Sequence, residues 1–240
     1  MNRGIDVSKW NGVIDFDAVK NSGIDFVIIR AGYGKESYQK DPYFESNYEG
    51  AKKAGLKVGA YWYSYAESID EAKKEASACL FVLDGRKLYL PVYYDVEESK
   101  QFNKGKNFID SIITVFCGII GSAGYTPGLY MSASPLKSHV SEAVRNKYEI
   151  WVAQYNNHCT YTGEYGIWQY SPRGSVPGIN GQVDMNYGYK DFCSTEKTVD
   201  ELAREVIAGK WGNGAERKRR LAEAGYNYRA VQDRVNEILR

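Results

Sequence analysis

Cysteine and histidine are scarce in this chain of 240 residues, which holds four cysteines and two histidines. The cysteines Cys79, Cys117, Cys159 and Cys193 are far apart, and none belongs to a Cys-x-x-Cys pair. No spacing therefore matches a zinc site, and we expect reduced cysteines and neither a metal nor another cofactor.

The chain also lacks an excess of charge and a long apolar run. Its 31 basic residues are matched by 30 acidic ones, so the total charge gives no indication of a nucleic acid partner. The most apolar stretch, residues 108–120, contains Asp110 and is too short to cross a bilayer. Its apolar residues recur at helical spacing, which predicts a helix that faces a core.

Two carboxylates, Asp95 and Glu97, are the most informative residues that are present. They lie in a predicted strand over residues 91–97, where side chains two apart project to the same face. Neighbouring carboxylates repel each other, so we expect one to hold a proton near neutral pH while the other stays ionised. Such a pair can protonate a leaving oxygen and stabilise positive charge at a sugar carbon. An acidic strand end that only faces water is the alternative.

Short apolar runs alternate with amphipathic segments over the first 190 residues. Strands are predicted at 4–7, 26–31, 58–64, 91–97, 128–131, 150–154, 166–170 and 182–185, and helices at 17–22, 43–54, 69–83, 106–121 and near 134–145. This alternation predicts an α/β fold with a parallel sheet, and eight strands predict closure into a barrel. The last strands are separated by loops too polar for helices, so we expect an irregular barrel.

Polar side chains recur near the ends of these predicted strands. In barrels of this kind the chemistry lies at the carboxyl ends of the strands. We therefore expect a set of polar residues from separate strands to converge on one cleft. They are Asp6, Arg30, Asp95, Glu97, Gln154, Gln169 and Asp184.

Residues 198–240 have the pattern of a small three-helix bundle, preceded by a linker at 193–197. Thr198-Val-Asp-Glu is a capping box, Gly209 and Gly225 end two predicted helices, and Asn227 can cap a third. Three short helices form only a marginal core. Trp211 either fills that core or faces a ligand, and we favour the core.

Eight short motifs occur in the order typical of glycoside hydrolase family 25, the muramidase-type lysozymes of phages, bacteria and fungi. The chain resembles that family over residues 4–190, and residues after 198 resemble the helical cell-wall-binding repeat of some phage lysins. The motifs are Gly-Ile-Asp-Val-Ser (4–8), Ile-Arg-Ala-Gly-Tyr-Gly (29–34), Ala-Tyr-Trp-Tyr-Ser (60–64), Tyr-Asp-Val-Glu (94–97), Gly-Leu-Tyr (128–130), Trp-Val-Ala-Gln-Tyr (151–155), Trp-Gln-Tyr (168–170) and Val-Asp-Met-Asn (183–186).

The resemblance implies an irregular (β/α)5(β)3 barrel over residues 1–192 that cleaves the β-1,4 bond from N-acetylmuramic acid to N-acetylglucosamine in peptidoglycan. Glu97 is the predicted general acid. Asp95 either attacks the anomeric carbon or orients the substrate's acetamido group, and the resemblance favours the second role. Asp6 and Asp184 would support this pair, whereas Glu98 should point to the other side of its strand.

Substrate-binding candidates are a cation, two amides and six aromatic rings. Arg30 either pairs with an active-site carboxylate, reaches an acid of the substrate or forms a structural ion pair. Aromatic faces stack on sugars, although we expect about half of these rings only to pack the barrel. The amides are Gln154 and Gln169, and the rings are Trp62, Tyr63, Tyr94, Tyr130, Trp151 and Trp168, of which Tyr63 and Tyr130 are preferred.

The leading hypothesis is a phage-type endolysin or bacterial autolysin whose partner is peptidoglycan and which does not insert into a membrane. No apolar signal segment precedes Gly4, so we expect the enzyme to remain in the host cytoplasm until lysis, unless an unrecognised route exports it. One alternative is a chitinase-like acetamido-sugar hydrolase, although its Asp-Gly-x-Asp-x-Asp-x-Glu motif is missing. Another is a wall-binding protein without catalysis, against which the four acids argue.

Overall fold

A computed structural model describes residues 1–190, 192, 199–224 and 226–239 of the chain. Contacts divide the chain into two compact units, Met1–Phe192 and Cys193–Arg240. The predicted linker at 193–197 and the predicted cap Thr198 lie outside the described residues.

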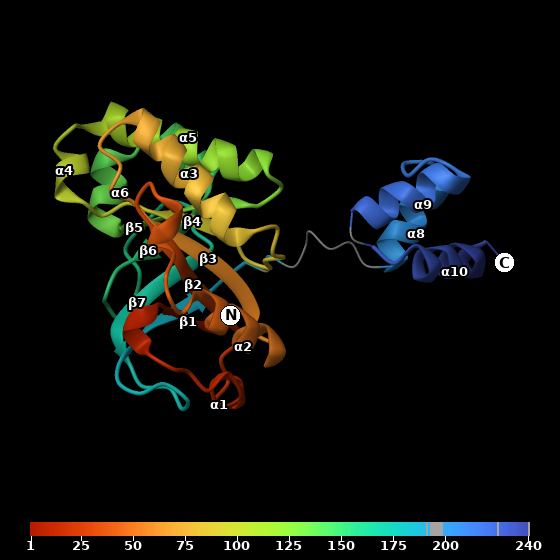
Figure 1. The fold of residues 1–240 in the computed structure, drawn as a ribbon, viewed down its shortest axis with the longest axis horizontal. Helices are drawn as coiled ribbons and strands as arrows, with labels where there is room; N and C mark the ends of the chain where they lie inside the picture. Colours follow the sequence, from red (N-terminus) through yellow and green to blue (C-terminus); the bar gives the residue numbers. More distant parts are fainter. Residues whose placement is uncertain (191, 193–198, 225, 240) are drawn as a thin grey trace. The chain divides into compact units, whose positions relative to one another are not determined.

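Eight strands of the first unit close into a barrel in which neighbours follow chain order (Figure 1). The predicted α/β barrel is therefore confirmed. The strands are β1 (Asn2–Val7), β2 (Phe26–Tyr33), β3 (Lys57–Tyr63), β4 (Val92–Asp95), β5 (Pro127–Ser132), β6 (Glu149–Ala153), β7 (Ile167–Gly174) and β8 (Val183–Gly188).

A helix follows each of the first five strands, and none separates the last three within the described residues 149–188, which confirms the (β/α)5(β)3 pattern. The predicted helix near 134–145 is two helices, because the chain is extended at Val140 and Ser141 caps the second one. The helices are α1 (Phe16–Asn21), α2 (Phe44–Lys53), α3 (Ile69–Leu83), α4 (Ser99–Phe102), α5 (Lys106–Ser122), α6 (Ala133–His139) and α7 (Glu142–Lys147), with short 3-10 turns η1 (Lys9–Asn11) and η2 (Ser37–Gln39).

Strand β8 runs antiparallel to both of its neighbours, so the prediction of a wholly parallel sheet was wrong. A parallel crossover takes about a dozen residues or more, and residues 175–182 between β7 and β8 are too few. The reversal puts the beginning of β8 beside the end of β1, where Asp184 pairs directly with Asp6.

The main core lies between the strands and the covering helices. Helices α3 and α5 pack side by side (Figure 1), and the predicted apolar face of α5 is buried. Phe116 of α5 stacks on Tyr94 of β4 with 3.9 Å between the ring centroids. The Tyr94 hydroxyl donates to the buried carboxylate of Glu75 (2.5 Å). This contact fixes the outward-pointing side of β4, so its other side can serve the barrel interior.

The second unit contains α8 (Val199–Ile207), α9 (Gly214–Glu223) and α10 (Tyr228–Ile238). Its core consists of Leu202, Ala203, Val206, Leu221, Val231 and Val235. Trp211 packs against this core, as favoured above, and its indole N–H donates to Glu205 (3.0 Å). The predicted cap is also found: the Asn227 side chain accepts from the first backbone amides of α10.

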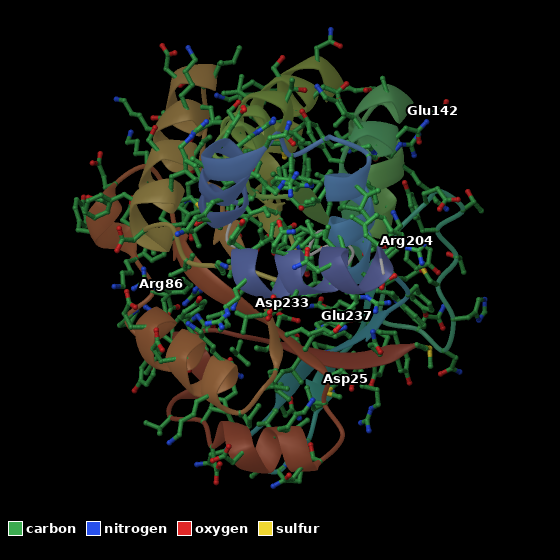
Figure 2. The ribbon with its side chains drawn as sticks, turned by 90° about the vertical axis from the view of Figure 1, so that its right-hand side faces the viewer. Asp25, Arg86, Glu142, Arg204, Asp233 and Glu237 are labelled. Atoms are coloured by element: carbon green, nitrogen blue, oxygen red, sulfur yellow. The ribbon has the colours of Figure 1, made fainter. Side chains whose placement is uncertain are left out.

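Ion pairs tie two helices of this unit together. Asp200 of α8 forms an ion pair with Arg234 of α10 (2.6 Å). Asp200 also pairs with Arg204, and Arg234 also pairs with Glu237; Arg204 and Glu237 are labelled in Figure 2. Such exposed pairs stabilise a protein weakly, so the apolar core described above holds the bundle together. In neither unit is a described helix long and apolar enough to span a membrane.

Candidate active site

A cleft of about 380 Å³ opens at the barrel mouth where the carboxyl ends of β1, β3 and β4 lie. A cavity of this size is within the range of small-ligand sites. The structure brings most of the predicted site residues together in its lining. They are Asp6, Arg30, Tyr63, Asp95, Glu97, Tyr130, Trp151, Gln169 and Asp184.

The four carboxylates enter the cleft from three strands and one loop. Asp95 is the last residue of β4, so the predicted strand ends two residues early and Glu97 lies in the segment that follows. Both still line the cleft. Asp6 and Asp184 are direct partners across β1 and β8, which directs both side chains to one face of the sheet.

Of the four cleft carboxylates, Asp95 is the least exposed to solvent. The residue is 4% exposed, and its Oδ1 has no hydrogen-bond partner among the described residues. Burial, followed by the charges of Glu97 and Asp6, raises the pKa of Asp95 well above its usual range, and the Arg30 guanidinium opposes the rise. Burial therefore favours the protonated form of Asp95.

The pKa of Glu97 is also raised, by burial and by the charges of Asp184 and Glu98. Its side chain remains open to the solvent in the cleft, but the concave walls still remove much of its hydration. Burial raises the pKa of Asp184 as well. The sequence predicted a proton on Glu97 and an ionised Asp95; burial raises the pKa of both carboxyls, and the strand-end position of Asp95 did not reveal its burial.

Asp6 is held by two amide side chains. Its Oδ2 accepts hydrogen bonds from Asn186 Nδ2 (2.8 Å) and Gln169 Nε2 (2.9 Å). Burial and the nearby Asp184 raise the pKa of Asp6 to about 8, although both hydrogen bonds favour the ionised form.

Arg30 forms an ion pair that also borders the cleft. Its Nε and Nη2 lie 2.7 Å from Asp41 Oδ2, and Asp41 is fully buried. Asp41 also accepts from the backbone amides of Lys9 (3.0 Å) and Tyr43 (2.9 Å). The structural ion pair expected as one alternative therefore exists, and it fixes a cation in the cleft wall.

Four predicted substrate-binding residues lie outside the lining of this cleft. Trp62 is fully buried and donates to the Gly34 carbonyl (2.9 Å), and Tyr94 is stacked under α5. The Gln154 side-chain amide donates a hydrogen bond to the Thr160 hydroxyl (2.8 Å), and the Trp168 indole N–H donates to the Gln154 backbone carbonyl (2.8 Å).

Strand alternation explains three of these misplacements. Trp62 lies between two cleft residues of β3, and Tyr94 and Trp168 directly precede the cleft residues Asp95 and Gln169. Adjacent side chains in a strand point to opposite faces, so these rings face the helices and loops outside the barrel. Glu98, expected on the far side of its strand, instead accepts a hydrogen bond from Tyr63 (2.8 Å).

Sequence reasoning missed several residues that line the cleft and two that lie behind its lining, Asn186 and Asp41. Tyr61 lies two residues before Tyr63 and Asn186 two residues after Asp184, so strand alternation was the available signal for both. No local pattern indicates Asp41. The other missed lining residues are Ser8, Trp10, Asn11, Tyr155 and Gln182.

The described part of the chain holds neither a cluster of metal ligands nor a disulfide. Among the described residues, no group of three or more His, Cys, Asp or Glu side chains could hold a metal ion. Cys79, Cys117 and Cys159 are free, as expected, and Cys193 lies outside the described residues.

The sequence and the barrel fold match known proteins. The model of the glycosyl hydrolases family 25 matches residues 5–179. The chain belongs to this family. A model of the CW_7 repeat matches residues 200–239, so the resemblances seen in the sequence are confirmed for both parts.

Relatives of this family 25 chain include lysozymes of a bacterium and a phage. The autolytic lysozyme of Clostridium acetobutylicum is 31% identical over 189 residues, which are 77% of this chain and 55% of the relative. The lysozyme of Streptococcus phage Cp-7 is 34% identical over 197 residues, 75% of this chain and 55% of the relative. The chain thus aligns with about half the length of each.

Solved structures share the fold. The lysozyme of Streptomyces coelicolor aligns with a TM-score of 0.68 and 25% identity, over 79% of this chain and 93% of that one. The autolysin LytC of Streptococcus pneumoniae, in complex with a synthetic peptidoglycan ligand, aligns with a TM-score of 0.69 and 28% identity, over 77% of this chain and 46% of that one.

Burial of Asp95 predicts that this carboxyl lowers the free energy of unfolding of the barrel at neutral pH. An acid whose pKa is raised by folding binds its proton more tightly in the folded state, so ionisation costs stability as the pH rises above the ordinary Asp range near 4. Asp95→Asn should therefore raise the free energy of unfolding by about 1–3 kcal/mol at pH 7. In urea titrations the gain should fade toward pH 3.

Asp70→Asn is the matched control for this measurement. Asp70 is exposed on α3, and its hydrogen bond with Lys73 (2.9 Å) lowers its pKa. The control should change stability by no more than about 0.5 kcal/mol. An Asp95→Asn variant that is less stable than wild type at pH 7 would contradict the argument.

Proposed function

We propose that the protein is a muramidase that cleaves the β-1,4 bond between N-acetylmuramic acid and N-acetylglucosamine in peptidoglycan. The observation that carries this proposal is the convergence of Asp6, Asp95, Glu97 and Asp184 on one cleft of a family 25 barrel. Paired carboxyls with raised pKa values are the groups that glycoside hydrolysis needs. The lysozymes and the peptidoglycan-bound autolysin among its relatives support the same substrate.

Glu97 is the proposed general acid. It is the cleft carboxyl that is open to solvent, so it can approach the bridging oxygen of a bound glycan. Its raised pKa keeps a proton available closer to neutral pH than an ordinary Glu would. Asp184 and Glu98 contribute to that rise, which gives these neighbours a role in setting the active pH range.

Asp95 is proposed to act on the acetamido group of the substrate. Its buried Oδ1 has no partner among the described residues, and a substrate N–H can supply the missing donor. The acetamido oxygen would then attack the anomeric carbon while Glu97 protonates the leaving oxygen. Hydrogen bonding to the N–H and the charge of Arg30 both favour ionised Asp95, which stabilises the positive charge that develops on the acetamido group. Water then opens the cyclic intermediate and returns its proton to Glu97.

Aromatic side chains form the walls and the rim of the cleft. Tyr63, Tyr130 and Trp151 lie in the walls, and Trp10 and Tyr155 remain 79% and 57% exposed at its border. Exposed rings with a polar handle suit stacking on sugars combined with hydrogen bonds to hydroxyls. Tyr63, Trp10 and Tyr155 are therefore the proposed carbohydrate contacts, and the buried Tyr130 and Trp151 complete the wall.

The second unit is proposed to attach the enzyme to the cell wall. Its match to the CW_7 repeat and the phage lysozyme relative support this role. The chain carries a single match to this repeat, and a single weak site gains no avidity from neighbours. We therefore expect attachment that is reversible and dependent on protein concentration.

Digestion of purified walls tests the bond that is cut. A muramidase leaves new reducing ends on N-acetylmuramic acid, which borohydride reduction and mass spectrometry identify. We expect these ends and no new reducing N-acetylglucosamine. Reducing N-acetylglucosamine ends would support the chitinase-like alternative, and unchanged walls at high enzyme concentration would support the binding protein without catalysis.

Substitution of the general acid tests its role directly. Glu97→Gln should lower the rate of wall clearing by ~10²–10⁴-fold, because it removes general acid catalysis. Glu142→Gln is the control, since Glu142 is an exposed carboxyl in the first turn of α7 and does not line the cleft. The control should keep most of its rate; equal losses in both variants would contradict the assignment.

Removal of the second unit tests the anchoring role. A chain ending at Phe192 should bind less to sedimented walls but still cleave small soluble peptidoglycan fragments at the full-length rate, because the cleft is built entirely from the first unit. The fragment assay serves as the folding control. Wall binding that equals that of the full chain would rule out anchoring by the second unit.

A further inference from the structure

A hydrogen-bond chain with a fixed direction ends at Asp6. Trp151 Nε1 donates to Asn186 Oδ1 (2.8 Å), and Asn186 Nδ2 donates to Asp6 Oδ2 (2.8 Å). All three residues are buried: Trp151 is 1% exposed, Asn186 0% and Asp6 6%. An indole N–H can only donate, so Asn186 must turn its oxygen to Trp151 and its NH₂ group to Asp6.

A second arm reaches the same oxygen. Gln169 Nε2 donates to Asp6 Oδ2 (2.9 Å), and Gln169 Oε1 accepts from the hydroxyls of Tyr130 (2.9 Å) and Tyr155 (3.1 Å). Hydroxyls can donate or accept, so this arm alone does not fix a direction. With both arms in place, Oδ2 accepts two N–H bonds.

This geometry restricts where Asp6 can carry a proton. A proton on Oδ2 that points toward Asn186 would need the Asn186 oxygen in place of its NH₂ group. Asn186 cannot rotate to provide it, because its NH₂ group would then face the indole N–H and leave two buried donors without acceptors.

We propose that Trp151 and Asn186 are positioning residues that hold one N–H donor on Asp6 Oδ2 whether the Asp6 carboxyl is ionised or neutral. The consequence for catalysis rests on the proposed function. Asp6 and Glu97 interact electrostatically in the cleft, so the protonation state of Asp6 affects how firmly Glu97 holds the proton it must deliver.

Opposing interactions determine the pKa of Asp6. Burial and Asp184 favour the neutral carboxyl, and the two amide donors favour the ionised one, with a resulting pKa of about 8. Weakening one donor should therefore move the titration measurably. The titratable and charged groups that share this cleft are Asp184 on β8, Asp95 on β4, Glu97 after β4, Arg30 on β2, Tyr61 on β3, Tyr130 on β5 and Tyr155 after β6.

The deciding experiment is a ¹³C-carboxyl NMR titration of Asp6 in the full chain carrying Trp151→Phe. Without the indole N–H, Asn186 is free to rotate and offer its oxygen to a protonated Asp6. The neutral form thereby gains a hydrogen bond, and the pKa of Asp6 should rise by about one pH unit.

Trp62→Phe is the matched control. Trp62 is also fully buried and also donates its indole N–H, but to the Gly34 carbonyl (2.9 Å) rather than to the chain that ends at Asp6. The Asp6 titration should not change in this variant. An equal rise in both variants would show a general packing effect and overturn the proposal, as would a Trp151→Phe titration identical to that of wild type.

Asn186→Ala keeps the test available if Trp151→Phe does not fold. It removes the amide that links Trp151 to Asp6, so Asp6 Oδ2 loses one N–H donor. Since that donor favours the ionised carboxyl, the Asp6 pKa should rise by about one pH unit. A fall or no change in the pKa would overturn the proposal.

The titration is read without substrate, so it separates this inference from the proposed function. Wall clearing is measured on the same samples. An inactive wild type with the expected Asp6 shift would refute the muramidase function and support the positioning roles. A wild type that clears walls, together with a Trp151→Phe variant whose Asp6 pKa is unchanged, would support the muramidase function and refute the positioning roles.

Discussion

The shortage of water around four carboxylates is the constraint on which this structure depends. Asp6, Asp95, Glu97 and Asp184 share one cleft, and burial raises the pKa of each of them. Close carboxyls in such a place cannot all be ionised, so protons are retained near neutral pH. The barrel supplies the rigidity that keeps these mutually repelling groups together, because each is anchored on or beside a strand.

Cations and donors are distributed unevenly around the four acids. Asp6 receives two amide N–H bonds, and Asp95 has only the more distant charge of Arg30, which is itself neutralised by Asp41. The unpaired Oδ1 of Asp95 is therefore the cleft oxygen that a donor from outside the chain would satisfy, which is the basis of the role proposed for it. The same unpaired oxygen lowers the stability of the free protein.

Much of the fold could be predicted from local patterns. Apolar spacing indicated all eight strands and the helical face of residues 108–120, since both depend on neighbours in the sequence. The direction of β8 could not be predicted from spacing within that strand. It depends on the length of its connection to β7, a signal that was present at residues 175–182 and was not used.

The site was predictable in its acids and less so in its rings. Asp95, Glu97, Asp6 and Asp184 belong to ordered motifs, whereas Trp62 and Trp168 are motif residues that point away from the cleft. Asp41 contacts Arg30 from a loop outside any motif, and only the folded chain reveals it. Burial, which decides where protons reside, is likewise a property of the assembled barrel rather than of any segment.

Pairing of β1 with β8 has a consequence for synthesis of the protein. The first strand finds one of its two partners only at residues 183–188, nearly the whole length of the barrel later. Contacts so distant in sequence form late in folding. A nascent chain on the ribosome holds Asp6 long before Asp184 and Asn186 exist, so the cleft with its four carboxylates is absent from every incomplete product and forms only after translation has passed the final strand.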